Sequence, residues 1–199
     1  MNRLQTALRD IGRLLEQRRF DWALIGGLAV SVRAEPRFTR DVDLAVAVES
    51  DTQAERLVGD LRGAGYEILE TVEQEATGRF ATARLLPPGG DPGGVVVDLL
   101  FASSGIEPEV VASAESLEML PGFRVPVAGL PELIALKLLA RDDDTRPQDA
   151  ADLAALTPLA TAGELESTRK LVRLIEERGY HRGRDLIAEL ERLTDALGV

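Results

Sequence analysis

A short stretch between Trp22 and Asp43 constrains the fold of this chain more than any other part of it. The apolar run from Trp22 to Ile25 predicts a buried strand, which Gly26 and Gly27 end. A helix of one or two turns follows, and a proline ends it because the residue before proline is pushed out of the helical region. A second strand then begins. The stretch therefore predicts a unit of strand, glycine turn, short helix and strand.

Two carboxylates stand at the head of that second strand, over residues 39–48. Alternate residues of a strand point to one side, so Asp41 and Asp43 share a face. Like charges this close repel each other, and such a pair usually persists because a cation lies between them. Carboxylates plus substrate phosphates are the usual ligands of magnesium in proteins. The alternative without a function is two solvated aspartates at a strand start, which an Asp-x-Asp pattern taken alone favours.

The glycine turn supplies the other half of a phosphate site. Glycine lets the backbone approach a ligand closely, and a helix that begins just after it aims free N–H groups at an anion. Gly26 and Gly27 therefore predict a phosphate cradle beside the metal ligands, and Arg37 and Thr39 strengthen that interpretation. The alternative is a tight strand–helix turn with no ligand.

A third aspartate lies in the middle of the apolar run from Val95 to Phe101. A buried charge is costly unless it is paired or bound to a metal. If this run is a strand beside that of Asp41 and Asp43, then Asp98 completes a set of three carboxylates. Three carboxylates can hold two magnesium ions for in-line attack at phosphorus, and the third is also a natural base for the attacking hydroxyl. The alternative is that Asp98 ends the strand and faces water.

Composition narrows the class of protein. The chain has 199 residues, a formal net charge of −11, no cysteine and one histidine. The lack of cysteine excludes disulfides and thiolate metal sites, and a single histidine argues against zinc. No apolar run approaches a membrane span and the N-terminus is an amphipathic pattern rather than a signal peptide, so we expect a cytoplasmic protein. The acidic charge argues against a broad nucleic-acid footprint but allows a small basic patch.

The remaining patterns predict an α+β protein in two domains. Helices are expected at 2–19, from 51 or 52 to about 62, and near 107–114, strands at 66–71, 79–86, 95–101 and 123–127, and a tight loop at 87–94. The rest of 102–121 looks irregular. From 129 onward the pattern is helical, at 133–141, 149–156, 163–178 and 184–197. We therefore expect an α/β domain over 1–128 and a helical domain over 129–199.

Three charged residues of the helical part, Lys137, Asp149 and Asp152, are candidates for a salt bridge or for a phosphate contact. Lys137 lies within the apolar helix LIALKLLA, where a lysine either extends to the surface or reaches a phosphate. Asp149 and Asp152 share a face of the next helix. For these groups taken alone, we favour a salt bridge between the two helices.

Together these residues resemble the nucleotidyltransferase superfamily with the polymerase-beta-type fold. The pattern is Gly26-Gly27, then Asp41-Val42-Asp43, then Asp98 on a later strand. The resemblance is nearest to the AbiEii-type nucleotidyltransferases, toxins of bacterial toxin–antitoxin and phage-defence systems. Their RxTxDxD pattern, helical lysine and DxxDL helix match Arg37, Thr39, Asp41 and Asp43, then Lys137, then Asp149 to Leu153. One departure is Gly27, where many members have serine.

The resemblance implies a nucleotidyltransferase-type mixed β-sheet with flanking helices, followed by a C-terminal helical bundle. It also implies a magnesium-dependent enzyme that moves a nucleoside monophosphate from a nucleoside triphosphate to an acceptor hydroxyl. The resemblance implies that two magnesium ions are bound by Asp41 and Asp43, with Asp98 as the third ligand or as the base. It implies nucleotide binding by Gly26, Gly27, Arg37, Thr39 and Lys137. Asp149 would orient the lysine or have a catalytic role.

The acceptor that the toxin-like resemblance favours is tRNA, with an antitoxin protein as partner and no membrane partner. Basic residues that would serve RNA occur near both ends of the chain, including Arg169, Lys170 and Arg173, although acidic residues among them also suit ordinary solvated helix faces. Two alternatives stay open. One is a nucleotidyltransferase that modifies an antibiotic or other small molecule. The other is a catalytically inactive binding module, against which the intact carboxylate triad argues.

Overall fold

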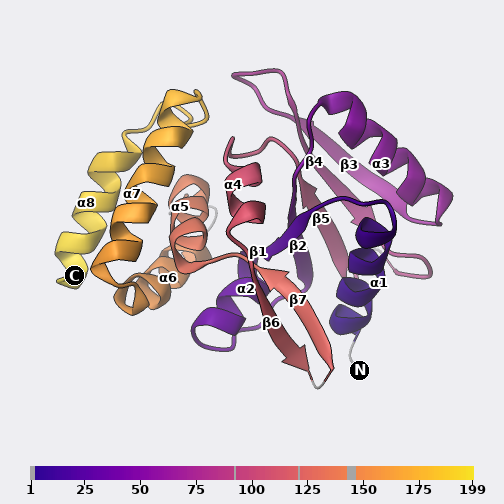
Figure 1. The fold of residues 1–199 in the computed structure, drawn as a ribbon, viewed down its shortest axis with the longest axis horizontal. Coiled ribbons are helices and arrows are strands. Elements are labelled where there is room, and N and C mark those ends of the chain that lie inside the picture. The colour runs from indigo at the N-terminus through magenta and orange to yellow at the C-terminus, as the bar shows by residue number, and fades with distance from the viewer. Residues whose placement is uncertain (1–2, 92, 121, 143–146) are drawn as a thin grey trace.

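The computed structural model describes residues 3–91, 93–120, 122–142 and 147–199. Its strands are β1 Trp22–Ile25, β2 Asp41–Val46, β3 Glu67–Glu73, β4 Phe80–Leu86, β5 Val96–Leu100, β6 Glu115–Leu120 and β7 Phe123–Val127. Its helices are α1 Arg3–Gln17, α2 Gly26–Arg33, α3 Asp51–Gly63, α4 Glu107–Ala112, α5 Leu130–Ala140, α6 Pro147–Leu156, α7 Ala162–Glu177 and α8 Leu186–Leu197, with a 3-10 turn at Thr157–Leu159. The expected α+β class with a mixed sheet and C-terminal helices is confirmed (Figure 1).

The strands form one sheet in the order β3-β4-β5-β2-β1-β7-β6. Strand β2 pairs antiparallel with β1 and parallel with β5, so the strand that carries Asp41 and Asp43 lies directly beside the strand that carries Asp98. Val42 and Leu44 on the opposite face of β2 are fully buried. This alternation of apolar and acidic residues orients β2, because a shift by one residue would bury the two carboxylates.

Two local expectations were wrong. Helix α3 is capped by Ser50, whose hydroxyl accepts a hydrogen bond from the Gln53 amide, rather than by Asp51 or Thr52. Residues 115–120 form strand β6 rather than irregular structure, and pair antiparallel with β7 at the edge of the sheet. The expected helix at 2–19 and loop at 87–94 each include residues that lie outside the described ranges.

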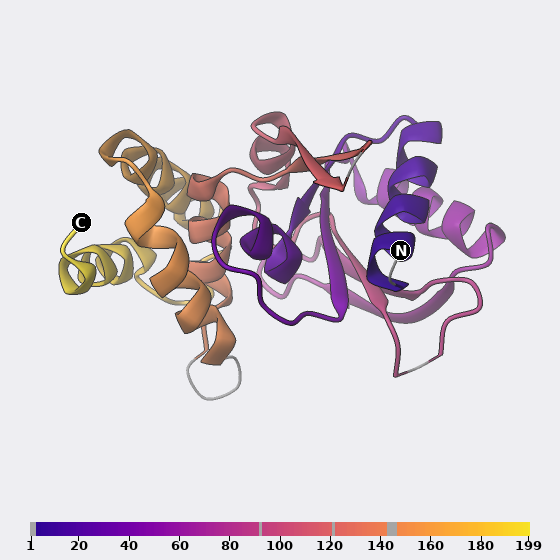
Figure 2. The same ribbon diagram turned by 90° about the horizontal axis from the view of Figure 1, so that it is seen from below.

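The helices from α5 onward gather at one end of the molecule, whereas α1 and α3 lie at the other end (Figures 1 and 2). One hydrophobic core nevertheless includes residues from both sides of position 129, such as Leu24 and Leu138. The division into domains at that position stays a prediction. None of the helices within the described ranges combines the length and the apolar character that a membrane crossing needs.

Candidate active site

A cavity of about 440 Å³ lies where the sheet meets α5. This volume is within the range of small-molecule sites, about 300–1,000 Å³. Asp41, Asp43 and Asp98 line it from the sheet, Gly26 lines it from the start of α2, and Lys137 lines it from α5. Residues from both sides of position 129 therefore meet at one concave site.

The carboxylates belong to a row of charged residues across neighbouring strands. Asp98 of β5 is the register partner of Asp43 on β2 and of Arg84 on β4, and Arg84 is the register partner of Glu70 on β3. Residues paired across strands point to the same face. From β3 to β2 the row therefore reads Glu70, Arg84, Asp98 and Asp43. Asp41 lies two residues before Asp43 on the same face of β2.

The carboxyl of Asp98 has a strongly perturbed pKa. Burial, and then the negative charge of Asp43, raise its pKa from 3.8 to about 7, although the Arg84 guanidinium opposes the rise. Its Oδ1 atom is buried and accepts no hydrogen bond from the residues that the structure describes. A buried oxygen without a donor, beside a second carboxylate, is a place where a cation would lower the free energy.

Arg84 is a cation beside two of these carboxylates, Asp41 and Asp98. Its Nη2 atom lies 3.6 Å from Asp41 Oδ2, and its Nε atom lies 3.7 Å from Asp98 Oδ1. Both separations are longer than the 2.7–3.2 Å of a normal hydrogen bond, so these are loose ion pairs. No pattern in the sequence points to this residue, since its position opposite Asp98 depends on strand register.

Gly26 allows Asp43 to lie against the backbone at the start of α2. Gly26 has φ +64°, and a Cβ atom there would be 2.0 Å from Asp43 Oδ2. The N-cap residue of α2 is Ile25, whose side chain makes no capping hydrogen bond. The first turn of a helix presents amide groups that can bind an anion, and here that turn begins beside the carboxylates.

The donor set suits a hard divalent cation such as magnesium, because it consists of carboxylate oxygens and includes the unsatisfied Oδ1 of Asp98. Within the described ranges, however, no three acidic or imidazole side chains are already gathered closely enough to enclose an ion. The residues thus fit magnesium as part of a ligand set that other oxygens would have to complete, as substrate phosphates do.

Lys137 is held by two aspartates of α6. Its Nζ atom lies 2.7 Å from Asp149 Oδ1 and 2.8 Å from Asp152 Oδ2, and all three side chains are at least nine-tenths buried. The salt bridge expected between the two helices is therefore present. The same lysine lines the cavity, so the aspartates fix the direction of a cation on the cavity wall.

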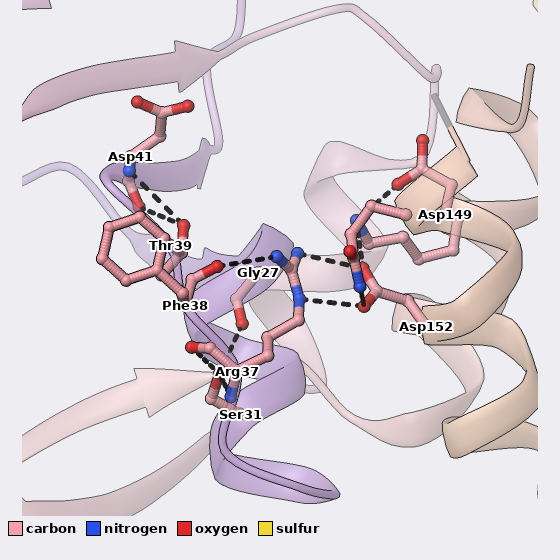
Figure 3. Close-up of polar contacts among 10 residues, drawn as sticks. Gly27, Ser31, Arg37, Phe38, Thr39, Asp41, Asp149 and Asp152 are labelled. Atoms are coloured by element: carbon pink, nitrogen blue, oxygen red, sulfur yellow. Dashed lines mark hydrogen bonds and ion pairs between the residues drawn. The ribbon is translucent and has the colours of Figure 1, made fainter. Parts of the chain in front are cut away.

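Arg37 adds a second cation to this cluster. Its Nη2 atom donates to Asp152 Oδ2 at 3.0 Å, and its Nε atom lies 2.9 Å from Asp152 Oδ1 (Figure 3). A Cβ atom on Gly27 would lie 2.3 Å from Arg37 Nη2. The guanidinium therefore fills the space that a serine side chain at position 27 would need, which is a physical reason for the departure from the common family pattern.

The structure brings part of the predicted set together at the cavity. Gly26, Asp41, Asp43, Asp98 and Lys137 line it, whereas Gly27, Arg37, Thr39 and Asp149 do not. Thr39 contacts the backbone of Asp41, and Asp149 contacts Lys137 behind the cavity wall. No sequence pattern points to five further polar residues that line the cavity, and Arg182, which also lines it, is expected from the sequence only as one of the C-terminal basic residues that could bind RNA. The five are Glu70, Thr82, Arg84, Ser103 and Ser104.

The C-terminal basic residues have mixed surroundings. Arg178 pairs with Glu109, and Arg184 pairs with Glu189 and donates to carbonyl oxygens at the end of α5. Both arginines therefore have structural roles. Lys170 and Arg173 are exposed on α7.

Comparison with known proteins extends these observations. A family model described as "Nucleotidyl transferase AbiEii toxin, Type IV TA system" matches residues 9–197. No curated protein sequence matches the chain.

Solved structures share the fold at low sequence identity. An antigenic nucleotidyltransferase-like protein from Paracoccidioides brasiliensis is 22% identical with a TM-score of 0.53, over 94% of this chain and 92% of that one. The lincosamide antibiotic adenylyltransferase LnuA, with lincomycin bound, is 17% identical with a TM-score of 0.50, over 77% of this chain and 96% of that one. At these identities the likeness concerns the fold alone.

Proposed function

The chain belongs to the AbiEii nucleotidyltransferase toxin family, and from this premise we propose that it transfers a nucleoside monophosphate from a nucleoside triphosphate to a hydroxyl group of an acceptor. One observation carries the proposal. Asp41, Asp43 and Asp98 line a single cavity together with Gly26, the first residue of α2. Carboxylates for a divalent cation thus adjoin backbone amides for phosphate, which is the arrangement that phosphoryl chemistry needs.

Asp41 and Asp43 are the proposed magnesium ligands, with Asp98 at the third position. Bound magnesium would neutralise the charge of the triphosphate and of the departing pyrophosphate. The first-turn amides of α2, beginning at Gly26, would bind phosphate oxygens.

In the proposed reaction, the acceptor hydroxyl attacks the α-phosphorus, Asp98 accepts its proton and pyrophosphate is the leaving group. The acceptor oxygen forms a bond to the α-phosphorus, and the bond from that phosphorus to the bridging oxygen of pyrophosphate breaks. Asp98 takes the proton of the attacking hydroxyl, because its Oδ1 has no hydrogen-bond donor among the described residues and burial favours its protonated form. Pyrophosphate leaves with the electron pair.

Lys137 is the proposed triphosphate ligand from the helical part. It lies on the cavity wall, and its contacts with Asp149 and Asp152 hold the ammonium in one direction. We assign a positioning role to both aspartates. Arg37 and Thr39 also act by position: Arg37 orients Asp152, and Thr39 supports the backbone of Asp41.

The proposed acceptor is tRNA and the proposed partner is an antitoxin protein, in keeping with the description of the family as toxins of type IV systems. Exposed Lys170 and Arg173 on α7, with Arg169 next to Lys170 and one turn from Arg173, supply a local basic surface on an acidic protein. Arg169 already pairs with Glu166, so its share in RNA binding is smaller.

The direct test is transfer from each of the four labelled nucleoside triphosphates to total tRNA, with magnesium and with the double variant Asp41→Ala, Asp43→Ala as the control. We expect labelled RNA with the wild-type protein and none with the variant, and transfer that falls as salt rises because phosphate contacts release counterions. The triple reversal Arg169→Glu, Lys170→Glu, Arg173→Glu should weaken transfer further. Label on a protein or small molecule instead of RNA would reject the tRNA acceptor, and no label at all would reject the transferase.

A further inference from the structure

We propose that Arg84 is a built-in counter-ion of the carboxylate site, which occupies the site in the metal-free protein and gives way to the divalent cation when the nucleotide brings its phosphates. The inference rests on the proposed function, because it assigns Arg84 a role toward the same metal. It makes Arg84 a positioning residue that couples metal binding to nucleotide binding.

The placement of Arg84 is the first argument. It stands opposite Asp98 in the row across the sheet, and its guanidinium contacts both Asp98 and Asp41. One side chain thus bridges two of the three proposed ligands. Those ligands do not yet form a closed set for a metal within the described part of the chain.

The looseness of these contacts is the second argument. The guanidinium lies 3.6 and 3.7 Å from its two carboxylates, and its side chain is 39% exposed. Lys137 differs in both respects, since it lies 2.7 and 2.8 Å from its aspartates and is 9% exposed. A half-solvated, loosely paired cation can leave at small cost, whereas separating a buried, tightly paired one is strongly unfavourable. Of these two cations that line the cavity, Arg84 is therefore the exchangeable one and Lys137 the fixed one.

A second acidic partner, Glu70, is available to Arg84 in the same cavity. Glu70, its register partner on β3, is exposed and lines the same cavity. A short movement toward Glu70 would uncover Asp41 and Asp98, and would leave the guanidinium within the cavity, where it can bind phosphate oxygens. Metal without nucleotide would face a resident positive charge, but metal together with phosphates would not.

Manganese serves as the probe, with its binding to the metal-free full chain followed by the loss of the free-ion electron paramagnetic resonance signal. Arg84→Gln removes the charge and keeps a polar side chain, and Arg84→Lys keeps the charge. Arg79→Gln is the matched control, because Arg79 has nearly the same exposure, 40%, but pairs with Asp51 away from the carboxylates. Asp43→Asn reports whether the ion binds at the proposed site.

Without nucleotide, we expect Arg84→Gln to bind Mn²⁺ about tenfold more tightly than the wild-type protein, the order expected when one charge is removed a few ångströms from a divalent ion in a solvated site. Arg84→Lys and Arg79→Gln should stay within about twofold of wild type. A non-hydrolysable triphosphate should shrink the gap between wild type and Arg84→Gln.

Equal Mn²⁺ affinity of wild type and Arg84→Gln, with both weakened by Asp43→Asn, would overturn the role of Arg84 and leave the metal site standing. An equal gain from Arg79→Gln would also overturn it, because the effect would then be one of net charge. Binding that Asp43→Asn does not alter in any background would instead reject the metal site itself, and the proposed function with it.

Discussion

Asp43 of β2 and Asp98 of β5 are register partners in a parallel strand pair, so their carboxylates leave the same face of the sheet side by side. Such an arrangement lowers the stability of the protein on its own, because a half-buried and a largely buried negative charge repel each other. Sites that bind cations commonly contain groups perturbed in this way.

The stability of the metal-free protein should fall as pH rises from about 4 to about 7. The folded-state pKa of Asp98 is raised from 3.8 to about 7, so between these values the folded protein holds a proton that the unfolded chain has lost. The raised pKa corresponds to on the order of 4 kcal/mol at most, fully lost above pH 7. Asp98→Asn has no such group. Its melting temperature should therefore exceed that of wild type by more at pH 8 than at pH 5.

Asp195→Asn is the control for this pH profile, because it removes the same charge from an exposed position on α8. We expect its melting temperature to follow that of wild type at every pH in the presence of a chelator. Parallel curves for wild type and Asp98→Asn would mean that Asp98 is ionised at ordinary pH in the folded protein.

Gly26→Ala should damage the site through Asp43. The new Cβ atom would lie 2.0 Å from Asp43 Oδ2, in addition to the strain of a positive φ. Gly179→Ala is the matched control, since Gly179 has φ +82° and no described atom within 4 Å of the added Cβ. The strain should cost each variant about 1–3 kcal/mol in urea unfolding. Only Gly26→Ala should also lose manganese and nucleotide affinity, and a similar loss in Gly179→Ala would show that backbone strain alone is responsible.

Gly27→Ser should be destabilising because of Arg37, and a double-mutant cycle tests this. The serine Cβ would lie 2.3 Å from Arg37 Nη2, so the contact between Arg37 and Asp152 has to shift. In an Arg37→Met background, the cost of the serine should be smaller. We expect a coupling free energy of about 0.5–3 kcal/mol from denaturant unfolding of the four proteins. Additive effects would show that the cost of a serine at position 27 does not depend on Arg37.

Lys137→Met should destabilise the protein by about 3–5 kcal/mol, because it leaves Asp149 and Asp152 buried with one cation fewer. The double variant Lys137→Met, Asp149→Asn should recover part of this loss. Lys137 also lines the cavity, so the folded single variant should bind a triphosphate more weakly, with little change for the monophosphate. Calorimetry well below the melting temperature separates the two effects, and unchanged triphosphate affinity would limit Lys137 to a structural role.

The sequence determined the local features of this protein. Strand alternation placed Asp41 and Asp43 on one face, and the apolar run around Asp98 identified a buried strand, as the structure confirms. The sequence also predicts the glycine turn and the short helix after it, which the structure confirms as α2. These features depend on the few residues on either side of each position, and the backbone periods of strand and helix translate such patterns directly into faces.

Only the tertiary structure decided which of these faces meet. That Asp98 stands between Asp43 and Arg84 depends on strand register, and that Arg37 reaches Asp152 depends on contact between residues 115 apart in the chain. The sequence does not predict strand β6 for a related reason, since its pairing with β7 rather than its own sequence pattern makes it a strand. Strand register and long-range packing depend on the whole core. A local sequence pattern therefore identifies the charged residues but not the residues that they contact in space.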